Sequence, residues 1–226
     1  MAEIVVQIQV FAYIGREELM TMIQLIPYNR RAAVDYAHEW AFRRNPVFYD
    51  FSQLGGDCTN FASQCLYAGV GVMNFTPEFG WYYISAEQRA PAWTGVPFFW
   101  DFMTRQERTA GPFGIPVPVS LLRPGDFVQI RFETSGEIFA HTPVVSVGFP
   151  PRLDNILVAA HSNDADNRPL DSYEKVVEMR YLHILGAVAP TPENGGEPLE
   201  SQLTPQTETP QTVPEQSTPS PEEGTV

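Results

Sequence analysis

The chain has 226 residues with a formal net charge of −13, 43% apolar and 12% aromatic residues, and two cysteines. This length and apolar content predict one globular domain with a sizeable core rather than two. Seven glutamates and no lysine or arginine follow residue 186, which leaves a net charge of −6 for residues 1–186. A mildly acidic body with a single lysine, Lys175, argues against nucleic-acid binding, which needs a basic stripe.

Residues 1–26 are expected to form an N-terminal extension with one strand-like run at 4–10. The extension has no basic region before its apolar stretch, and that stretch is too short to cross a membrane. We therefore expect a soluble chain without a signal peptide or a membrane span, which favours the cytoplasm. From Asn29 onward, apolar residues recur at helical spacing until Asn45-Pro46, which predicts a helix over 29–44.

A second helix is predicted to begin at Cys58, directly after Gly-Gly-Asp at 55–57, and to end near residue 68 with Gly69 as its stop. Backbone N–H groups at a helix start and the positive end of the helix dipole stabilise a nearby anion, so this thiol could ionise near neutral pH. Cys65 follows seven residues later on the same helix, about 10 Å along its axis, so no disulfide is predicted.

Residues 70–120 are rich in turns and aromatic side chains, with one short helix predicted near 96–106. Four strands should follow, at 126–132, 141–147, 156–160 and 176–184. Helices first and an antiparallel sheet afterwards predict an α+β fold. Pro143 lacks the N–H that a central strand needs, which indicates an edge strand there. Residues 187–226 are rich in Pro, Thr and Glu and are expected to form a disordered tail.

A cysteine nucleophile needs a base, which is usually a histidine brought close by the fold. Of the four histidines, His38 lies within a predicted helix and His183 near the end of the body, where packing or surface roles are favoured. His141 opens one apolar strand and His161 follows another. If these two strands pair, His141 and His161 meet at one end of the sheet.

Metal binding is a competing interpretation of the same side chains. Cys58, Cys65, His141 and His161 could hold zinc, but two cysteines seven residues apart on a helix do not match the close pairs of structural zinc sites. The segment 164–167 is rich in oxygen ligands but lacks the glycine and the distant glutamate of a calcium loop, so a solvated turn is expected. We predict no metal and no cofactor.

The order of these motifs is similar to that of the NlpC/P60 and CHAP group of papain-like cysteine hydrolases. More closely, three segments over residues 27–186 resemble the bacterial family called putative amidase domain. These segments are Tyr28–Ala37, Gly56–Leu66 and His161–Leu170. The resemblance implies a papain-like domain at 27–186 in which N-terminal helices pack on a small antiparallel sheet.

The resemblance further implies a cysteine hydrolase that cleaves an amide or peptide bond through an acyl-enzyme. Cys58 would be the nucleophile, His141 the general base and His161 the polar third residue, with Asn163 as the alternative third residue. The Cys58 N–H and, as a second donor, Tyr49 would stabilise the oxyanion. The long separation of Cys58 and His141 departs from compact NlpC/P60 domains and fits an insertion between them.

Peptides or simple amides are the implied substrates, with peptidoglycan peptides as one class, and this kinship favours the cell envelope over the cytoplasm. Of the two compartments, the cytoplasm stays slightly favoured, because no signal peptide is seen. An aromatic wall at Trp81 or Trp93 would suit such a substrate, although core packing is the favoured role of both side chains. The alternative function is a non-catalytic peptide-binding module on the same scaffold.

Overall fold

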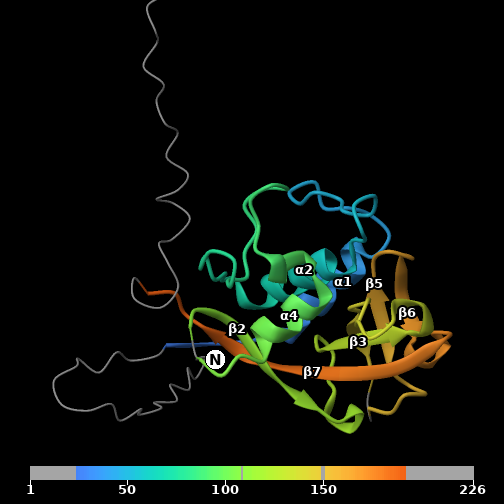
Figure 1. The fold of residues 1–226 in the computed structure, drawn as a ribbon. Helices are drawn as coiled ribbons and strands as arrows, with labels where there is room; N and C mark the ends of the chain where they lie inside the picture. Colours follow the sequence, from blue (N-terminus) through green and yellow to red (C-terminus); the bar gives the residue numbers. More distant parts are fainter. Residues whose placement is uncertain (1–23, 108, 149–150, 192–226) are drawn as a thin grey trace, which may run out of the picture.

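The computed structural model describes residues 24–107, 109–148 and 151–191 (Figure 1). The helices are α1 Arg30–Trp40, α2 Cys58–Val70, α3 Pro91–Thr94 and α4 Val96–Met103, with short 3₁₀ turns at Val119–Leu121, Glu133–Ser135 and Leu170–Ser172. The strands are β1 Leu25–Pro27, β2 Gly111–Val117, β3 Phe127–Phe132, β4 Val144–Val147, β5 Leu157–Ala160, β6 Ala165–Pro169 and β7 Val176–Val188. Helices followed by an antiparallel sheet confirm the predicted α+β class.

The first two helices begin where the sequence predicted. Asn29 caps α1, because its side-chain oxygen accepts a hydrogen bond from the Ala32 N–H at 3.1 Å. The predicted stop of α2 at Gly69 is wrong: α2 runs to Val70 and is capped by Gly71, whose φ of 69° places it in the left-handed region and whose N–H donates to the Tyr67 carbonyl at 2.8 Å. Gly69 serves packing instead, because a Cβ there would lie 2.2 Å from the ring of Tyr28.

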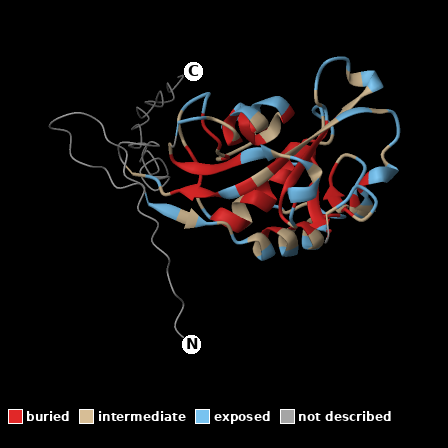
Figure 2. Cartoon of the chain, turned by 90° about the horizontal axis from the view of Figure 1, so that it is seen from below, coloured by how far each residue is buried: buried red, intermediate tan, exposed pale blue. Residues whose placement is uncertain are grey.

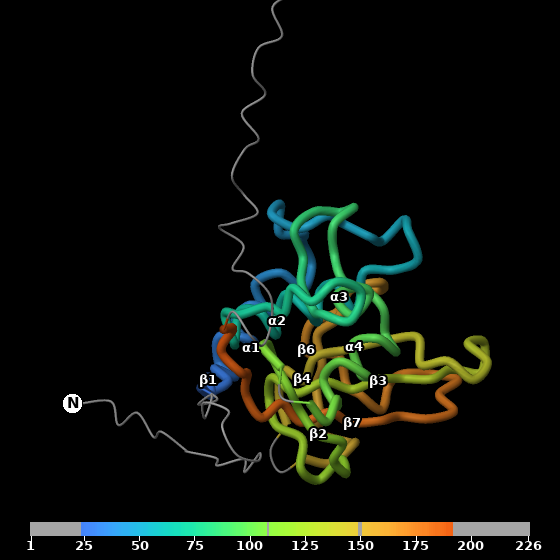
Figure 3. The backbone as a smooth tube through the Cα atoms, turned by 60° about the vertical axis from the view of Figure 1, so that its left-hand side comes forward, coloured from blue at the N-terminus to red at the C-terminus, as the bar shows by residue number. Residues whose placement is uncertain are grey.

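The sheet runs in the order β1-β7-β3-β4-β5-β6, with all neighbouring strands antiparallel, and β2 also pairs with β7. The long strand β7 pairs with β1, β2 and β3, and the helices gather on one side of it (Figure 1). Figure 3 shows β2 and β7 on the side of the molecule opposite α3. The prediction of an edge strand at Pro143 is wrong, because β4 lies between β3 and β5. Pro143 precedes β4, so its missing N–H does not interrupt the ladder.

Two hydrophobic clusters fill the interior, and buried residues concentrate there while the outer loops are exposed (Figure 2). Successive side chains of a strand point to opposite faces of the sheet. Accordingly, Phe127 of β3 joins the cluster beneath the helices, whereas Val128 and Ile130 join the smaller cluster on the other face. Gln129, on the same face as Phe127, is buried and donates to the Val96 carbonyl, which ties β3 to α4.

The sheet extends slightly beyond both predicted domain limits. Leu25 of β1 pairs with Val188 at the end of β7, so residues on either side of the predicted span 27–186 belong to it. The division into an extension, a domain and a tail remains a prediction, because the run at 4–10 and residues 192–226 lie outside the described residues. Among residues 24–107, 109–148 and 151–191, no helix is long and apolar enough to cross a membrane.

Candidate active site

Cys58 is the first residue of α2, and a network around Asp57 fixes the turn that leads to it. The Asp57 side chain forms no helix-capping bond. Its buried carboxylate accepts hydrogen bonds from the Phe51 N–H at 2.9 Å and the Asn60 amide at 2.8 Å, and it pairs with His161 Nδ1 at 2.6 Å. The Asp57 N–H in turn donates to Ser162 Oγ at 2.7 Å. The turn is therefore held from the helix, from the preceding loop and from the segment after β5.

The Cys58 thiol lies against the segment that carries His141. Its Sγ is 4.0 Å from the Ala140 carbonyl oxygen and 3.8 Å from Thr59 Oγ1. Thr59 Oγ1 also bonds Thr142 Oγ1 at 3.2 Å, which joins the start of α2 to this segment. Ala140 and Thr142 flank His141 in the chain, so the contacts bracket that histidine.

Cys58 is only 7% exposed, and burial raises the pKa of its thiol. Hydrogen bonds from the Thr142 backbone and from the Thr59 side chain and backbone lower this pKa and offset part of the effect. The thiol is therefore protonated at neutral pH in this structure, which differs from the sequence-based expectation. The physical reason is that desolvation of the anion outweighs the favourable helix start.

His141 is held by β3 and by a tyrosine that follows β6. Its backbone forms an isolated bridge with Ile130, whose N–H donates to the His141 carbonyl at 3.0 Å. Its Nε2 lies 3.2 Å from the hydroxyl of Tyr173. Burial and the positive charge of Arg168 lower the pKa of His141 to about 4. The imidazole is therefore neutral at pH 7, as a general base must be.

A pocket of about 340 Å³ contains both side chains. Cys58, His141 and Asn163 are the predicted site residues that line it, together with Gly55 and Gly56. Tyr173, Arg168, Glu174 and Ser162 line it as well, although the sequence did not single them out. They come from β6 and the turns beside it, where neither helical nor alternating periodicity marks a site.

His161 lies behind the helix start and is not part of the pocket lining. It is 1% exposed and stacks on Phe61 with ring centroids 4.0 Å apart. Its Nδ1 pairs with Asp57 and its Nε2 lies 2.9 Å from the Trp40 carbonyl oxygen. Both ring nitrogens of His161 therefore contact groups other than His141.

The remaining candidates lie away from the pocket. Tyr49 is 46% exposed, packs edge-to-face against Phe51 and is not among the lining residues. Trp81 and Trp93 are fully buried and lie 4.8 Å apart. Their indole N–H groups donate to Ser63 Oγ at 3.0 Å and Asn60 Oδ1 at 2.9 Å. The structure therefore places both tryptophans in the core.

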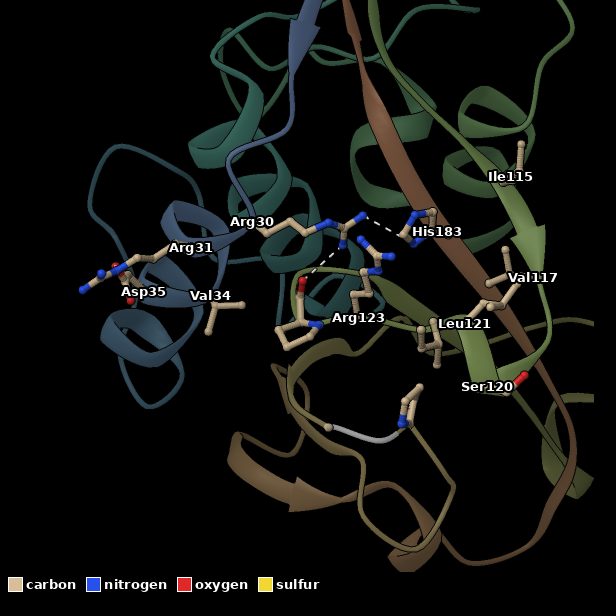
Figure 4. A pocket seen from close by; sticks show the side chains of 14 residues that line it. Arg30, Arg31, Val34, Asp35, Ile115, Val117, Ser120, Leu121, Arg123 and His183 are labelled. Atoms are coloured by element: carbon tan, nitrogen blue, oxygen red, sulfur yellow. Dashed lines mark hydrogen bonds and ion pairs between the residues drawn. The ribbon is translucent and has the colours of Figure 1, made fainter. Parts of the chain in front are cut away.

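A larger cavity of about 810 Å³ lies between α1, β2 and the turn before β3 (Figure 4). Arg30, Arg31, Arg123 and His183 line it among apolar side chains. Arg30 and His183 both bind the buried carboxylate of Asp126, at 2.7 Å each, so they serve to join α1, β3 and β7. No cysteine lines this cavity.

The described part of the chain contains no set of side chains arranged as the metal hypothesis requires. Within residues 24–107, 109–148 and 151–191, no group of three or more His, Cys, Asp or Glu side chains is arranged to hold a metal ion. Cys58 and Cys65 are both buried free thiols.

Comparison with known proteins gives a family. The chain is 32% identical over 134 residues to the uncharacterized protein YhbB of Bacillus subtilis (strain 168). The aligned part is 58% of this chain and 41% of the relative, so the chain spans less than half the length of that protein. No solved structure matches. Residues 27–184 match the putative amidase domain, which indicates amide hydrolysis at a general level. Because this match covers well over half of the sequence, the chain belongs to the putative amidase domain family.

Proposed function

We propose that the chain is a cysteine hydrolase that cleaves an amide bond through an acyl-enzyme, with Cys58 as nucleophile and His141 as general base. The observation that carries this proposal is the contact of Cys58 Sγ with residues on both sides of His141, in a pocket that both side chains line. A cysteine on a helix start beside a histidine from the sheet is also the arrangement of papain-like hydrolases, and we propose that relationship.

The chemistry starts from a neutral pair. The thiol sulfur attacks the amide carbonyl carbon while its proton moves to His141, and Nδ1 is the nitrogen left for this transfer because Nε2 bonds Tyr173. The C–N bond then breaks as the imidazolium returns the proton to the leaving amine. Water, activated by the same imidazole, hydrolyses the thioester and restores Cys58.

Tyr173 takes the position of a third residue, because its hydroxyl is the group that bonds the far nitrogen of His141. When Nε2–H donates to the tyrosine oxygen, Nδ1 carries the lone pair that the base needs. His161 was the first sequence-based candidate for this role, and its bonds to Asp57 and the Trp40 carbonyl favour a role in holding the helix start. Asn163 remains the alternative because its side chain lines the pocket.

The Cys58 N–H is the proposed oxyanion donor, since the first N–H groups of a helix have no partner within it. Tyr49 is not included, because it does not line the pocket. Peptide amides, with peptidoglycan peptides among them, are the proposed substrates on the strength of the family resemblance.

The test is hydrolysis of a panel of peptide amides and peptidoglycan peptides by the full chain and three variants. We expect Cys58→Ala to abolish turnover and His141→Gln to reduce kcat by at least about a hundredfold. Cys65→Ala is the matched control, because Cys65 is a buried thiol two turns further along α2. The wild type and this control should also form a thioester adduct on Cys58 that mass spectrometry detects.

Turnover that survives in Cys58→Ala would overturn the proposal. Binding of a wall peptide by the wild type and Cys58→Ala alike, without turnover by either, would support the non-catalytic peptide-binding module instead.

A further inference from the structure

Arg168 lies on the wall of the pocket that holds Cys58 and His141, and its guanidinium is fixed in place. It is near the end of β6, and its Nε donates to Ser172 Oγ at 3.0 Å while Nη2 donates to the Ser172 carbonyl at 3.2 Å. Its carbon Cζ also sits 3.9 Å from the centroid of the Tyr173 ring. A cation held on an aromatic face and by two oxygens loses little further freedom when it binds a ligand.

The contacts of Arg168 leave its charge uncompensated. Both oxygens of Ser172 are neutral, and within residues 24–107, 109–148 and 151–191 no carboxylate forms an ion pair with this guanidinium. Other arginines of this acidic chain have such partners: Arg44 binds Asp164 and Arg131 binds Glu178. The other charged side chain on the wall, Glu174, is exposed and unpaired with Arg168. An arginine fork without a carboxylate is suited to receive one.

The position of this charge relative to the reactive side chains determines what it could do. Arg168 stacks on the same Tyr173 whose hydroxyl bonds His141, and its charge is close enough to contribute to the lowered pKa of His141. An anionic group bound by Arg168 would thus lie beside the thiol within one pocket.

We propose that Arg168 binds a carboxylate of the substrate, so that the pocket takes acidic amides, in which a free carboxylate lies close to the scissile bond. That the bound molecule is also hydrolysed rests on the proposed function, whereas the binding of a carboxylate beside Cys58 does not. The carboxylate would place two oxygens opposite the guanidinium edge that Ser172 leaves open, and this contact would orient the amide carbonyl toward Sγ.

Two alkylating reagents of nearly equal size test this without any known substrate. In both reactions the Cys58 sulfur displaces iodide from a CH₂ group and the thiol proton passes to His141 or to solvent. Iodoacetate carries a carboxylate beside that CH₂ group and iodoacetamide carries a neutral amide. Peptide mass mapping follows the alkylation of Cys58 over time, and the observable is the ratio of the two rate constants. Any effect on the ionisation of the thiol cancels in this ratio.

We expect the ratio of iodoacetate to iodoacetamide to exceed that of free glutathione in the wild type and to fall by roughly tenfold in Arg168→Gln. Arg168→Lys, which keeps the charge and loses the fork, should give an intermediate ratio. Arg31→Gln is the matched control for net charge, because Arg31 is exposed on α1 and lines the other cavity. This control should keep the wild-type ratio, and Glu174→Gln should not lower it.

Equal ratios in the wild type, Arg168→Gln and Arg31→Gln would overturn the proposal, as would an equal fall in both arginine variants. The proposed function fails separately. An enzyme that hydrolyses amides but shows no change of ratio would defeat the role of Arg168 alone. A chain that loses the iodoacetate preference in Arg168→Gln yet hydrolyses no amide would keep the carboxylate site and defeat the hydrolase.

Discussion

Replacing His141 by glutamine should remove a specific pH dependence of stability. Burial and the charge of Arg168 lower the pKa of His141 from 6.5 to about 4, which corresponds to about 3 kcal/mol of differential interaction. The folded state then keeps this imidazole neutral while the unfolded chain takes up a proton below pH 6.5. The free energy of unfolding is therefore unaffected by this titration above about pH 6.5, and it falls as the pH drops from there toward about 4 because only the unfolded chain takes up the proton.

The difference in free energy of unfolding between the wild type and His141→Gln is expected to shrink by about 2.5 kcal/mol on going from about pH 7.5 to about pH 4.5. Urea unfolding followed by tryptophan fluorescence at several pH values measures it, and groups that titrate alike in both proteins cancel. A proton NMR titration of the His141 ring gives the same pKa directly. A difference that is constant over this range, or a ring that titrates near pH 6.5, would refute the claim that burial and Arg168 depress the pKa of His141.

Three further predictions concern the residues around this pair. Tyr173→Phe removes the hydroxyl that bonds His141 Nε2, so it should lower kcat/KM by roughly three- to tenfold and shift the tautomer of His141, which nitrogen NMR detects. An unchanged tautomer would argue against a role of Tyr173 in positioning His141. Asp57→Asn removes the buried carboxylate that binds the His161 ring, the Asn60 amide and the Phe51 N–H, and it should lower the free energy of unfolding in urea by about 3 kcal/mol; a loss below about 1 kcal/mol would contradict a structural role for this network. A Cβ at Gly71 would meet no atom within 4 Å, so Gly71→Ala should cost about 1 kcal/mol from its positive φ alone. Gly69→Ala should cost more because its Cβ would meet the Tyr28 ring. The reverse order in thermal melts would contradict the close packing of Gly69 on Tyr28.

Local signals predicted much of the fold correctly. The helical spacing after Asn29 and the Gly-Gly-Asp turn before Cys58 gave the starts of α1 and α2, and the four apolar runs became β3, β4, β5 and β7. The strands that were missed, β1, β2 and β6, are short or contain proline and glycine. They form because β7 and β5 offer them a partner, and such pairing is a tertiary effect that single-sequence periodicity does not record.

The site was predictable only where one residue type is rare. Two cysteines and four histidines made Cys58 and His141 easy to consider, and the fold brings both into one pocket. Tyr173 and Arg168 belong to types that occur throughout the chain. Their relevance comes from one hydrogen bond and one stacking contact across the pocket, which no spacing along the chain reveals.

His141 and His161 show most clearly where sequence reasoning ends. Each borders an apolar strand, and β4 and β5 do pair, as the sequence argument required. The two imidazoles nevertheless meet different groups, because Asp57, just before Cys58, turns its carboxylate inward to His161 rather than capping α2. A buried carboxylate needs strong donors, and the His161 ring, the Asn60 amide and the Phe51 N–H supply them. Both ring nitrogens of His161 are thus taken up by Asp57 and the Trp40 carbonyl, whereas the His141 ring contacts the Tyr173 hydroxyl through Nε2 and lines the same pocket as Cys58. This difference is why we propose His141, and not His161, as the base.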